Sequence, residues 1–359
     1  EQLLADCTFS FDFKLPKNRR LYGSSREDDL ALLTKLAYEG LRYRYPRSDR
    51  EAKARVEKEL KVIHELHFDA YFLITWDIIR YARSRGYFHV GRGSGANSIV
   101  AYCLGITDVD PITLDLYFER FINSERTSPP DFDIDFSWDE RNDIIDYIFK
   151  RYGAKHVCLL ATYVTFRDKS IYRELAKVFG LPKAEIDAWL DPATAMREVS
   201  SEIQALIVKY GQLLLDFPNY LSIHAGGILI SDAPLSAYTA LEGMPKGFPI
   251  CQFDMYVAEE IGFAKFDILS QRGLGHIKEA VDIIRGLLSG HEGFQPSHPP
   301  LVHVTEFSDW AINIRLMYWY HPSAPVKQLE FNQQLIIRIA ERLQQADIRI
   351  AVMGTPQSR

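Results

Sequence analysis

The stretch Pro129-Pro130-Asp131-Phe132-Asp133-Ile134-Asp135-Phe136 alternates acidic and apolar residues strictly. Successive side chains of a β-strand point to opposite faces, so this order predicts a strand with three aspartates on one face and the apolar residues in the core. Aspartate is a poor strand former, and three of them in alternation need a reason. Two carboxylates about 4 Å apart repel by roughly 4 kcal/mol in an effective dielectric near 20, so a cation or a proton has to offset them.

The acidic strand predicts a divalent-metal site. Ligands that offer only oxygen favour Mg²⁺ or Ca²⁺ over zinc, and paired divalent ions between carboxylates serve in-line displacement at phosphorus. Nucleotidyl transfer is therefore the leading chemistry, and a solvated acidic strand face is the alternative. Ile261–Leu269 is a second strand candidate, on which Lys265 and Asp267 would project to one side. A lone Lys-x-Asp pair is nonspecific.

A glycine-rich segment, Gly91-Arg92-Gly93-Ser94-Gly95-Ala96-Asn97-Ser98, follows the short strand candidate Tyr87–Val90 and precedes an apolar helix that should end at Gly105. A glycine turn and a helix N-terminus together form an anion site, because free amides and the helix dipole point at the same place. A triphosphate would suit that site. Such turns are also common for structural reasons alone, so both interpretations stay open.

The segments that flank the acidic strand are expected to be helical. The first 50 residues should form polar loops and short helices, and two further helices are predicted between Arg50 and about Arg85. After the strand, Ser137-Trp138-Asp139-Glu140 has the pattern of a capping box. It predicts a helix that ends at Gly153 and buries Ile144, Ile145, Ile148 and Tyr152.

The formal net charge of −6 means that any phosphate-binding surface has to be local. Lys169, Arg173 and Lys177 recur every four residues, which predicts an amphipathic helix with a basic ridge. Residues 153–183 hold six Lys or Arg and two acids. The ridge is a candidate DNA-binding surface, and a solvated helix face is the alternative. Its apolar side would carry Ile171, Leu175 and Val178.

A Pro-rich stretch at 291–300 predicts a linker to a small α/β domain at 301–359. That tail should contain a strand over Val302–Tyr320, a helix and a strand over Ile348–Val352, and it should be energetically separate from the rest. The helix carries Leu329, Leu335, Ile336, Ile339 and Leu343. No apolar run approaches the roughly 20 residues of a membrane span, and no signal-peptide pattern is present. We therefore expect a cytoplasmic protein.

Five motifs in order resemble the alpha subunit of bacterial DNA polymerase III, the C family of DNA polymerases, over roughly residues 5–290. This resemblance implies an α+β fold with a nucleotidyltransferase palm like that of polymerase beta. The palm would comprise 1–152, with an N-terminal lead-in, and 223–290, and a helical thumb would be inserted at 153–222. The motifs are Gly91-Arg92-Gly93-Ser94, Phe118-Glu119-Arg120-Phe121, Pro130–Phe136, His224-Ala225-Gly226-Gly227 and Lys265-Phe266-Asp267.

The resemblance also implies roles for individual residues. Asp131, Asp133 and Asp267 would be catalytic and would hold two Mg²⁺ ions, with Asp135 as a neighbour. The residues implied in triphosphate binding are Gly91, Arg92, Gly93, Ser94, Ser98, Arg120 and Lys265, and those implied in duplex binding are Lys169, Arg173 and Lys177. The implied activity is template-directed DNA synthesis in replication or repair. Its partners would be primed DNA, deoxynucleoside triphosphates and other replisome subunits, with no membrane.

Two departures from the family pattern point to a divergent branch near the error-prone paralogues: Asn97 in the glycine loop and Ile-Leu-Ser-Gln after Asp267. The fingers that normally follow the palm are not found in this sequence. Residues 301–359 instead resemble the cytoplasmic C-terminal domain of small-conductance mechanosensitive channels. Two rival hypotheses follow: a truncated or chimeric DNA-binding remnant with little polymerase activity, and a tail that serves as an oligomerisation module.

Overall fold

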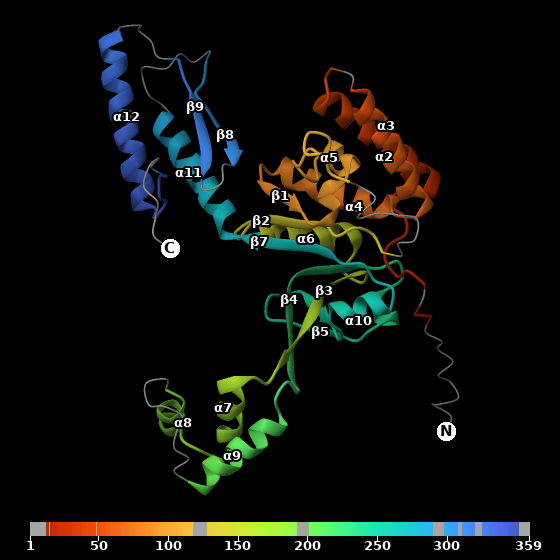
Figure 1. Ribbon diagram of the computed structural model, residues 1–359, viewed down its shortest axis with the longest axis vertical. Helices are drawn as coiled ribbons and strands as arrows, with labels where there is room; N and C mark the ends of the chain where they lie inside the picture. The colour runs from red at the N-terminus through yellow and green to blue at the C-terminus, as the bar shows by residue number, and fades with distance from the viewer. Residues whose placement is uncertain are drawn as a thin grey trace.

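A computed structural model describes residues 12–13, 15–47, 49–117, 128–191, 201–289, 298–307, 311–319 and 325–351. A mixed sheet of seven strands lies at the centre of the molecule, in the order β1-β2-β7-β4-β3-β6-β5 (Figure 1). Strand β2 is parallel to β7 and β3 is parallel to β6, and the other neighbours are antiparallel. The strands are β1 (His89–Arg92), β2 (Asp133–Ser137), β3 (Val157–Thr165), β4 (Pro218–Ile230), β5 (Leu241–Gly243), β6 (Pro249–Cys251) and β7 (Phe266–Gln271).

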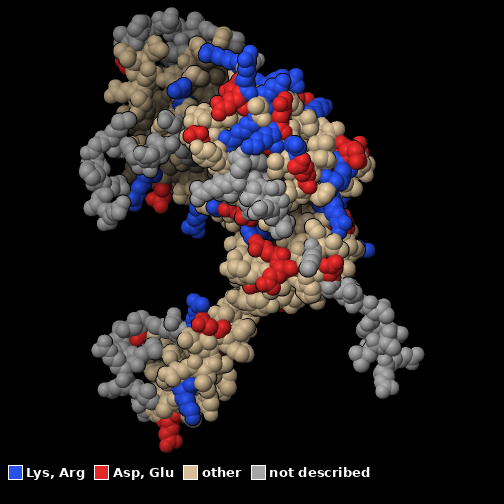
Figure 2. Space-filling model, turned by 45° about the vertical axis from the view of Figure 1, so that its right-hand side comes forward, with Lys and Arg blue, Asp and Glu red and all other residues tan. Residues whose placement is uncertain are grey.

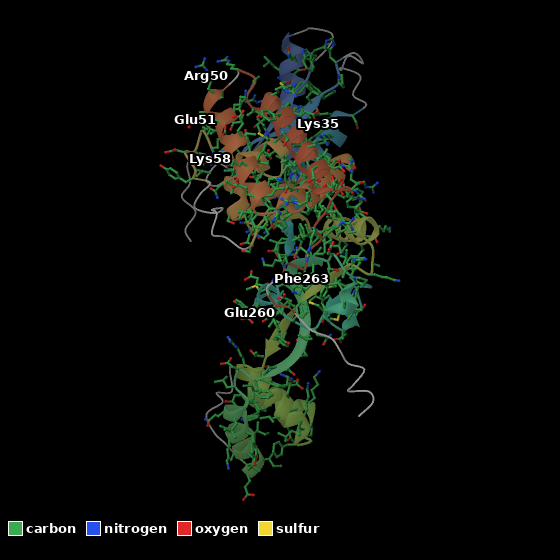
Figure 3. The ribbon with its side chains drawn as sticks, turned by 90° about the vertical axis from the view of Figure 1, so that its right-hand side faces the viewer. Lys35, Arg50, Glu51, Lys58, Glu260 and Phe263 are labelled. Carbon is green, nitrogen blue, oxygen red and sulfur yellow. The ribbon has the colours of Figure 1, made fainter. Side chains whose placement is uncertain are left out.

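Helices before the acidic strand cover one side of this sheet (Figure 1). The expectation of polar loops and short helices in the first 50 residues is wrong, because α2 (Arg26–Arg44) runs for 19 residues and buries Leu33, Ala37 and Leu41. The predicted pair of helices after Arg50 is confirmed as α3 (Arg50–Glu65) and α4 (Asp69–Ser84). Their surface side is charged, and Figure 3 shows Arg50, Glu51 and Lys58 at the outer edge of the molecule.

The apolar side of the predicted acidic strand is confirmed, although β2 begins only at Asp133, after Asp131, and Asp135 is buried too. Phe132, Ile134 and Phe136 are all buried in the main core. Phe132 stacks on Tyr71, with ring centroids 5.7 Å apart, and meets Phe72 edge-on at 5.2 Å, so α4 fixes the start of β2. Aromatic pairs of this kind contribute about 1 kcal/mol each beyond their area burial. The apolar side of this segment therefore packs against α4, which fixes the position of the aspartates on its other side.

The capping box predicted at Ser137–Glu140 is wrong. Ser137 ends β2, and its hydroxyl donates to the Asp139 carboxylate rather than capping a helix. Helix α6 (Arg141–Tyr152) begins later and has no side-chain cap. Glu140 is buried and lies 2.7 Å from the Lys278 ammonium, so it joins α6 to α11 (Arg272–Leu288) instead. The predicted buried side of α6 and its end at Gly153, with φ of 91°, are confirmed.

Three helices lie between β3 and β4, which extend beyond the sheet to carry them (Figure 1). They are α7 (Asp168–Val178), α8 (Lys183–Leu190) and α9 (Glu202–Leu213). Ile171 is buried and Leu175 packs against a small core, as predicted, but Val178 is 81% exposed and does not belong to the apolar side. The division at 153 and 222 stays a prediction, since β3 itself lies in the central sheet.

The tail forms a hairpin and a helix. The single strand predicted over Val302–Tyr320 is two antiparallel strands, β8 (Leu301–Phe307) and β9 (Ile312–Met317), followed by α12 (Pro325–Gln345). The strand predicted at Ile348–Val352 is absent from its described part, residues 348–351. Leu335 and Leu343 are buried on α12 and Ile339 packs beside them, whereas Leu329 and Ile336 are exposed and do not face the core.

Helix α11 supplies the cover for this tail. Val281, Ile284 and Leu288 of α11 form one hydrophobic cluster with Val302 of β8 and Leu335 of α12. The same helix starts directly after β7, so the sheet that carries the aspartates and the tail share a continuous helix. The expected energetic separation of the tail stays a prediction, and the shared cluster argues against it, because the apolar side of α11 packs against β8 and α12.

Candidate active site

Two of the three predicted catalytic aspartates are direct neighbours in the sheet. Asp133 on β2 and Asp267 on β7 are register partners on parallel strands. Neighbouring strands lie about 4.8 Å apart, so both carboxylates rise from the same point of the sheet. Asp131 comes just before β2 and is exposed, whereas Asp133 is half-buried and Asp267 is buried. The sequence separates Asp133 and Asp267 widely, and the fold brings them together.

The protein's own cations offset this negative charge. Arg92 on β1 reaches Asp133 at 3.0 Å through Nη1 and Asp135 at 2.6 Å through Nε. Lys265 forms an ion pair with Asp267, two residues along the chain. The cation that the acidic strand requires is thus present within the fold. Asp135 is buried and also accepts from Gln271 Nε2 at 3.3 Å, so it holds Arg92 in place rather than facing solvent.

The ionisation of the site follows from burial and these charges. Burial raises the pKa of Asp133, with the charge of Asp267 adding to it and Arg92 and Lys265 opposing it. Burial alone would lower the pKa of Lys265, but the hydrogen bond and charge of Asp267 outweigh it, and the pKa lies above its ordinary value. Further positive charge beside Asp133 would therefore favour its ionised form.

One oxygen in the site lacks a partner. The buried Oδ1 of Asp267 accepts no hydrogen bond from any residue that the structure describes. Across those same residues, no three His, Cys, Asp or Glu side chains lie close enough to hold one metal ion together. The predicted metal ligands are present as hard oxygen donors, but two of them are held by Arg92 and Lys265. A buried carboxylate oxygen without a partner is costly, which is the position that a cation would relieve.

The glycine loop packs directly on the acidic segment. Gly93 has φ of 90°, and a Cβ there would lie 2.6 Å from the backbone oxygen of Asp131. A Cβ on Gly95 would lie 2.2 Å from the Phe132 ring. The Gly95 amide donates to Asp131 O at 2.9 Å, and the Asp131 amide donates to Ser94 Oγ at 3.0 Å. These glycines are therefore needed for close approach, and the loop positions Asp131.

The N-terminus of α5 (Ile99–Leu104), where a triphosphate was expected, holds a carboxylate of the protein itself. Glu59 of α3 is fully buried, and it accepts from Ser98 Oγ at 2.7 Å and from the Val100 amide at 3.2 Å. Arg55 donates to its other oxygen at 3.2 Å. A phosphate at this helix start would have to displace Glu59, so the role expected for Ser98 stays a prediction. The predicted end of the helix at Gly105 is confirmed.

The structure describes only part of the remaining predicted site residues. Arg120 lies outside the described residues, as does the side chain of Lys169. Arg173 forms an ion pair with Asp187 at 2.7 Å, and Lys177 forms one with Glu174 at 2.7 Å. Figure 2 shows few charged side chains on the visible face of α7–α9, whereas Lys and Arg gather on the upper part of the molecule. The basic ridge is thus partly neutralised within the protein.

Sequence reasoning missed two residues that shape the site. In the sequence, Glu59 has the pattern of an ordinary helix-surface residue. Its burial depends on the packing of α3 against α5, which no local pattern shows. Arg141 at the start of α6 donates to Ile268 O at 2.6 Å and to Ala225 O at 2.7 Å, so it ties β7 to β4. The motif that contains His224 indicates no role for this residue. Its ring accepts from the Gly226 and Gly227 amides, and burial lowers its pKa.

Comparison with known proteins gives two family matches along the chain. The family model described as Bacterial DNA polymerase III alpha NTPase domain matches residues 31–270. The family model described as Mechanosensitive ion channel MscS, C-terminal, matches residues 274–350, which includes most of α11 as well as the tail. The boundary between the two matches falls at the start of α11 rather than at the linker predicted for 291–300.

Curated relatives agree with the first match. An error-prone DNA polymerase of Symbiobacterium thermophilum is 38% identical over 273 residues, which is 71% of this chain and 25% of the relative. One of Pseudomonas syringae pv. tomato is 38% identical over 298 residues, 77% of this chain and 28% of the relative. One of Methylococcus capsulatus is 37% identical over 269 residues, with 70% and 26% covered. The chain thus spans about a quarter of the length of these relatives.

Proposed function

Since this chain belongs to the family of the bacterial DNA polymerase III alpha NTPase domain, we propose that its site performs template-directed nucleotidyl transfer to a primer. The observation that carries the proposal is the pairing of Asp133 with Asp267 in register on parallel strands. Hydrogen bonds from the glycine loop to the backbone of Asp131 fix its position beside this pair. The oxygen of a primer 3′-hydroxyl would attack the alpha phosphorus of a deoxynucleoside triphosphate, and pyrophosphate would leave.

The donor chemistry fits divalent ions of the Mg²⁺ type. All three candidate ligands offer carboxylate oxygens, and the buried Asp267 Oδ1 lacks a partner among the described residues. We propose that Asp131, Asp133 and Asp267 hold two Mg²⁺ ions. Bound there, the ions would lower the pKa of the primer hydroxyl and stabilise the charge of the leaving pyrophosphate. No side-chain nucleophile is then required.

Arg92 and Lys265 would bind the substrate in this proposal. In this structure both side chains form ion pairs with the carboxylates. A triphosphate that approaches the ends of these strands would meet the same two cations. When the carboxylates bind other positive charge, these two cations become free to contact phosphate oxygens. Burial around Lys265 strengthens such contacts, because screening by water is weaker there. Gly91, Gly93 and Ser94 of the loop would line the same approach, and triphosphate binding is proposed for Arg120 from the family motif alone.

The proposed partners are primed DNA, deoxynucleoside triphosphates and other replisome subunits, with duplex contacts from Lys169, Arg173 and Lys177. A palm at 1–152 and 223–290 with a thumb at 153–222 would arrange them. Within the described parts of the chain, no helix is long and apolar enough to cross a membrane. We place the protein in the cytoplasm on this proposal.

Mg²⁺-dependent extension of a primed template tests the proposal. The full chain should add deoxynucleotides, and Asp133→Asn and Asp267→Asn should each reduce the rate by a factor of at least about a hundred. Asp139→Asn is a matched control, because that carboxylate lies beyond β2 and outside the site. If all four proteins extend primers equally, the assignment is wrong. If none does but primed DNA binds, the chain is a DNA-binding remnant.

Asp131 and Asp133 can also be tested without turnover. Mg²⁺ should raise the melting temperature of the wild type and should do so less in Asp131→Asn and Asp133→Asn, because each loses a ligand. An equal Mg²⁺ response in all three proteins would show that the ion binds elsewhere.

A further inference from the structure

Strand β4 contains a large bulge, His224–Gly227, next to the site. Leu159 of β3 pairs with Ile228, and Ala161 pairs with Ile223, so a single residue of β3 lies opposite the four residues His224–Gly227. Bulges of this kind interrupt the ladder and redirect side chains, and they are frequent beside active sites. Arg141 of α6 anchors this one through its 2.7 Å bond to the Ala225 oxygen.

The bulge fixes the protonation of the His224 ring. The amides of Gly226 and Gly227 donate to His224 Nδ1 at 3.2 and 2.8 Å. A nitrogen that accepts from two amides carries no proton, so the proton of the neutral ring is on Nε2. The ring therefore presents one N–H donor on the edge that faces away from the bulge. No described residue accepts a hydrogen bond from Nε2, and the side chain is only half-buried.

The bulge lies directly beside a candidate catalytic carboxylate. Gly227 is the register partner of Asp267 on β7. A Cβ on Gly226 would lie 3.4 Å from Asp267 Oδ1 and 2.5 Å from the Leu269 side chain, so only glycine allows this approach. His224 thus belongs to the bulge that packs beside Asp267, and the charges of Asp267 and Lys265 act on its ring.

We propose that His224 binds substrate, with its Nε2–H donating to a phosphate oxygen held beside Asp267. The proposal rests on the proposed function, since it takes the same site. A neutral donor adds a hydrogen bond without adding charge to a site in which Asp133 and Asp267 already form ion pairs. The phosphate belongs either to the deoxynucleoside triphosphate or to the terminal nucleotide of the primer.

His224→Asn separates binding from folding. An asparagine side-chain oxygen accepts from backbone amides two or three residues on, so it can hold the Gly226 and Gly227 amides and keep the bulge. It cannot place a donor where Nε2–H lies. His224→Ala loses both the acceptor and the donor. His303→Asn, an exposed change on β8, is the matched control.

The experiment measures dissociation constants of the full chain for two ligands without turnover. Equilibrium dialysis gives the value for a deoxynucleoside triphosphate, and fluorescence anisotropy gives the value for a labelled primed duplex. His224→Asn should weaken one of the two by about tenfold at an unchanged melting temperature, and the affected ligand identifies the phosphate. His224→Ala should also lower the melting temperature, and His303→Asn should change neither.

Wild-type affinity for both ligands in His224→Asn would overturn the proposal, as would failure of the wild type to bind either. A wild type that binds both ligands but does not extend a primer would refute the proposed function. In that case the difference in binding between wild type and His224→Asn would still decide the role of His224.

Discussion

Replacing Glu59 by Gln tests the buried carboxylate beneath the glycine loop. Glu59 is 0% exposed, and burial raises its pKa from 4.5 to about 7, against opposing bonds from Ser98 and the Val100 amide and the charge of Arg55. A glutamine oxygen can still accept from Ser98 and Val100. The substitution therefore removes the titration while it keeps the shape and two of the hydrogen bonds.

The sign of the pH effect follows from linkage. A carboxyl whose pKa is higher in the folded state binds its proton more tightly when folded, so it stabilises the fold below pH 4.5 and loses that contribution as the pH rises to about 7. From pH 5 to pH 8 the loss is roughly 2 to 3 kcal/mol for a shift of this size. Above pH 8 no further change is expected from this group.

Urea unfolding at pH 5, 6, 7 and 8 measures the effect for wild type and Glu59→Gln. All other groups titrate alike in both proteins, so the difference between the two curves isolates residue 59. The free energy of unfolding of Glu59→Gln should fall by roughly 2 to 3 kcal/mol less than that of wild type between pH 5 and pH 8. Glu51→Gln, an exposed change on the same helix, should follow the wild type (Figure 3).

Parallel curves for wild type and Glu59→Gln over this range would refute the reasoning. That result would mean that Arg55 and the amides of α5 compensate the burial of Glu59 fully. The N-terminus of α5 would then be a strong carboxylate site rather than a costly one, and a phosphate would compete poorly for it.

Three further perturbations follow from the geometry. Gly93→Ala should lower the free energy of unfolding by roughly 2 kcal/mol more than Gly247→Ala. Both glycines have positive φ, but only a Cβ at 93 meets backbone within 3 Å. Equal losses in urea titrations would show that the loop can shift to accommodate the Cβ. Deletion of 295–359 should cause aggregation in size-exclusion chromatography, since it uncovers the apolar side of α11; a monomer with an unchanged melting temperature would contradict this. Arg173→Ala should cost under about 1 kcal/mol of stability, because its ion pair is partly exposed. It should also reduce the slope of log affinity for primed DNA against log salt concentration by about one. An unchanged slope would mean that the ridge is only a solvated helix face.

Local patterns were enough to predict the elements of the site. The alternation at Asp131–Phe136 predicted a strand with a buried apolar side, and the spacing of Ile144, Ile145 and Ile148 predicted the helix after it. Both patterns depend only on the period of one strand or helix. The family motifs, read in order, gave the family to which the chain belongs.

Failures of prediction arose where another residue, near or distant in the sequence, competes for the same group. Ser137 and Glu140 have capping-box spacing, but Asp139 takes the hydroxyl and Lys278 of α11 takes the carboxylate. In the tail, helical spacing placed Leu329 and Ile336 with the core residues of α12, yet α11 covers only part of that helix. A periodic pattern gives the faces of a helix but not the neighbour that covers them.

The sequence by itself determined which residues can carry the chemistry: three aspartates, a glycine loop and nearby cations. Only the tertiary structure decided how they meet, because the parallel pairing of β2 with β7 joins segments more than a hundred residues apart along the chain. It also decided that Glu59 fills the helix start and that Arg92 and Lys265 lie on the carboxylates. Such contacts depend on which elements share a core, and no local period encodes that choice.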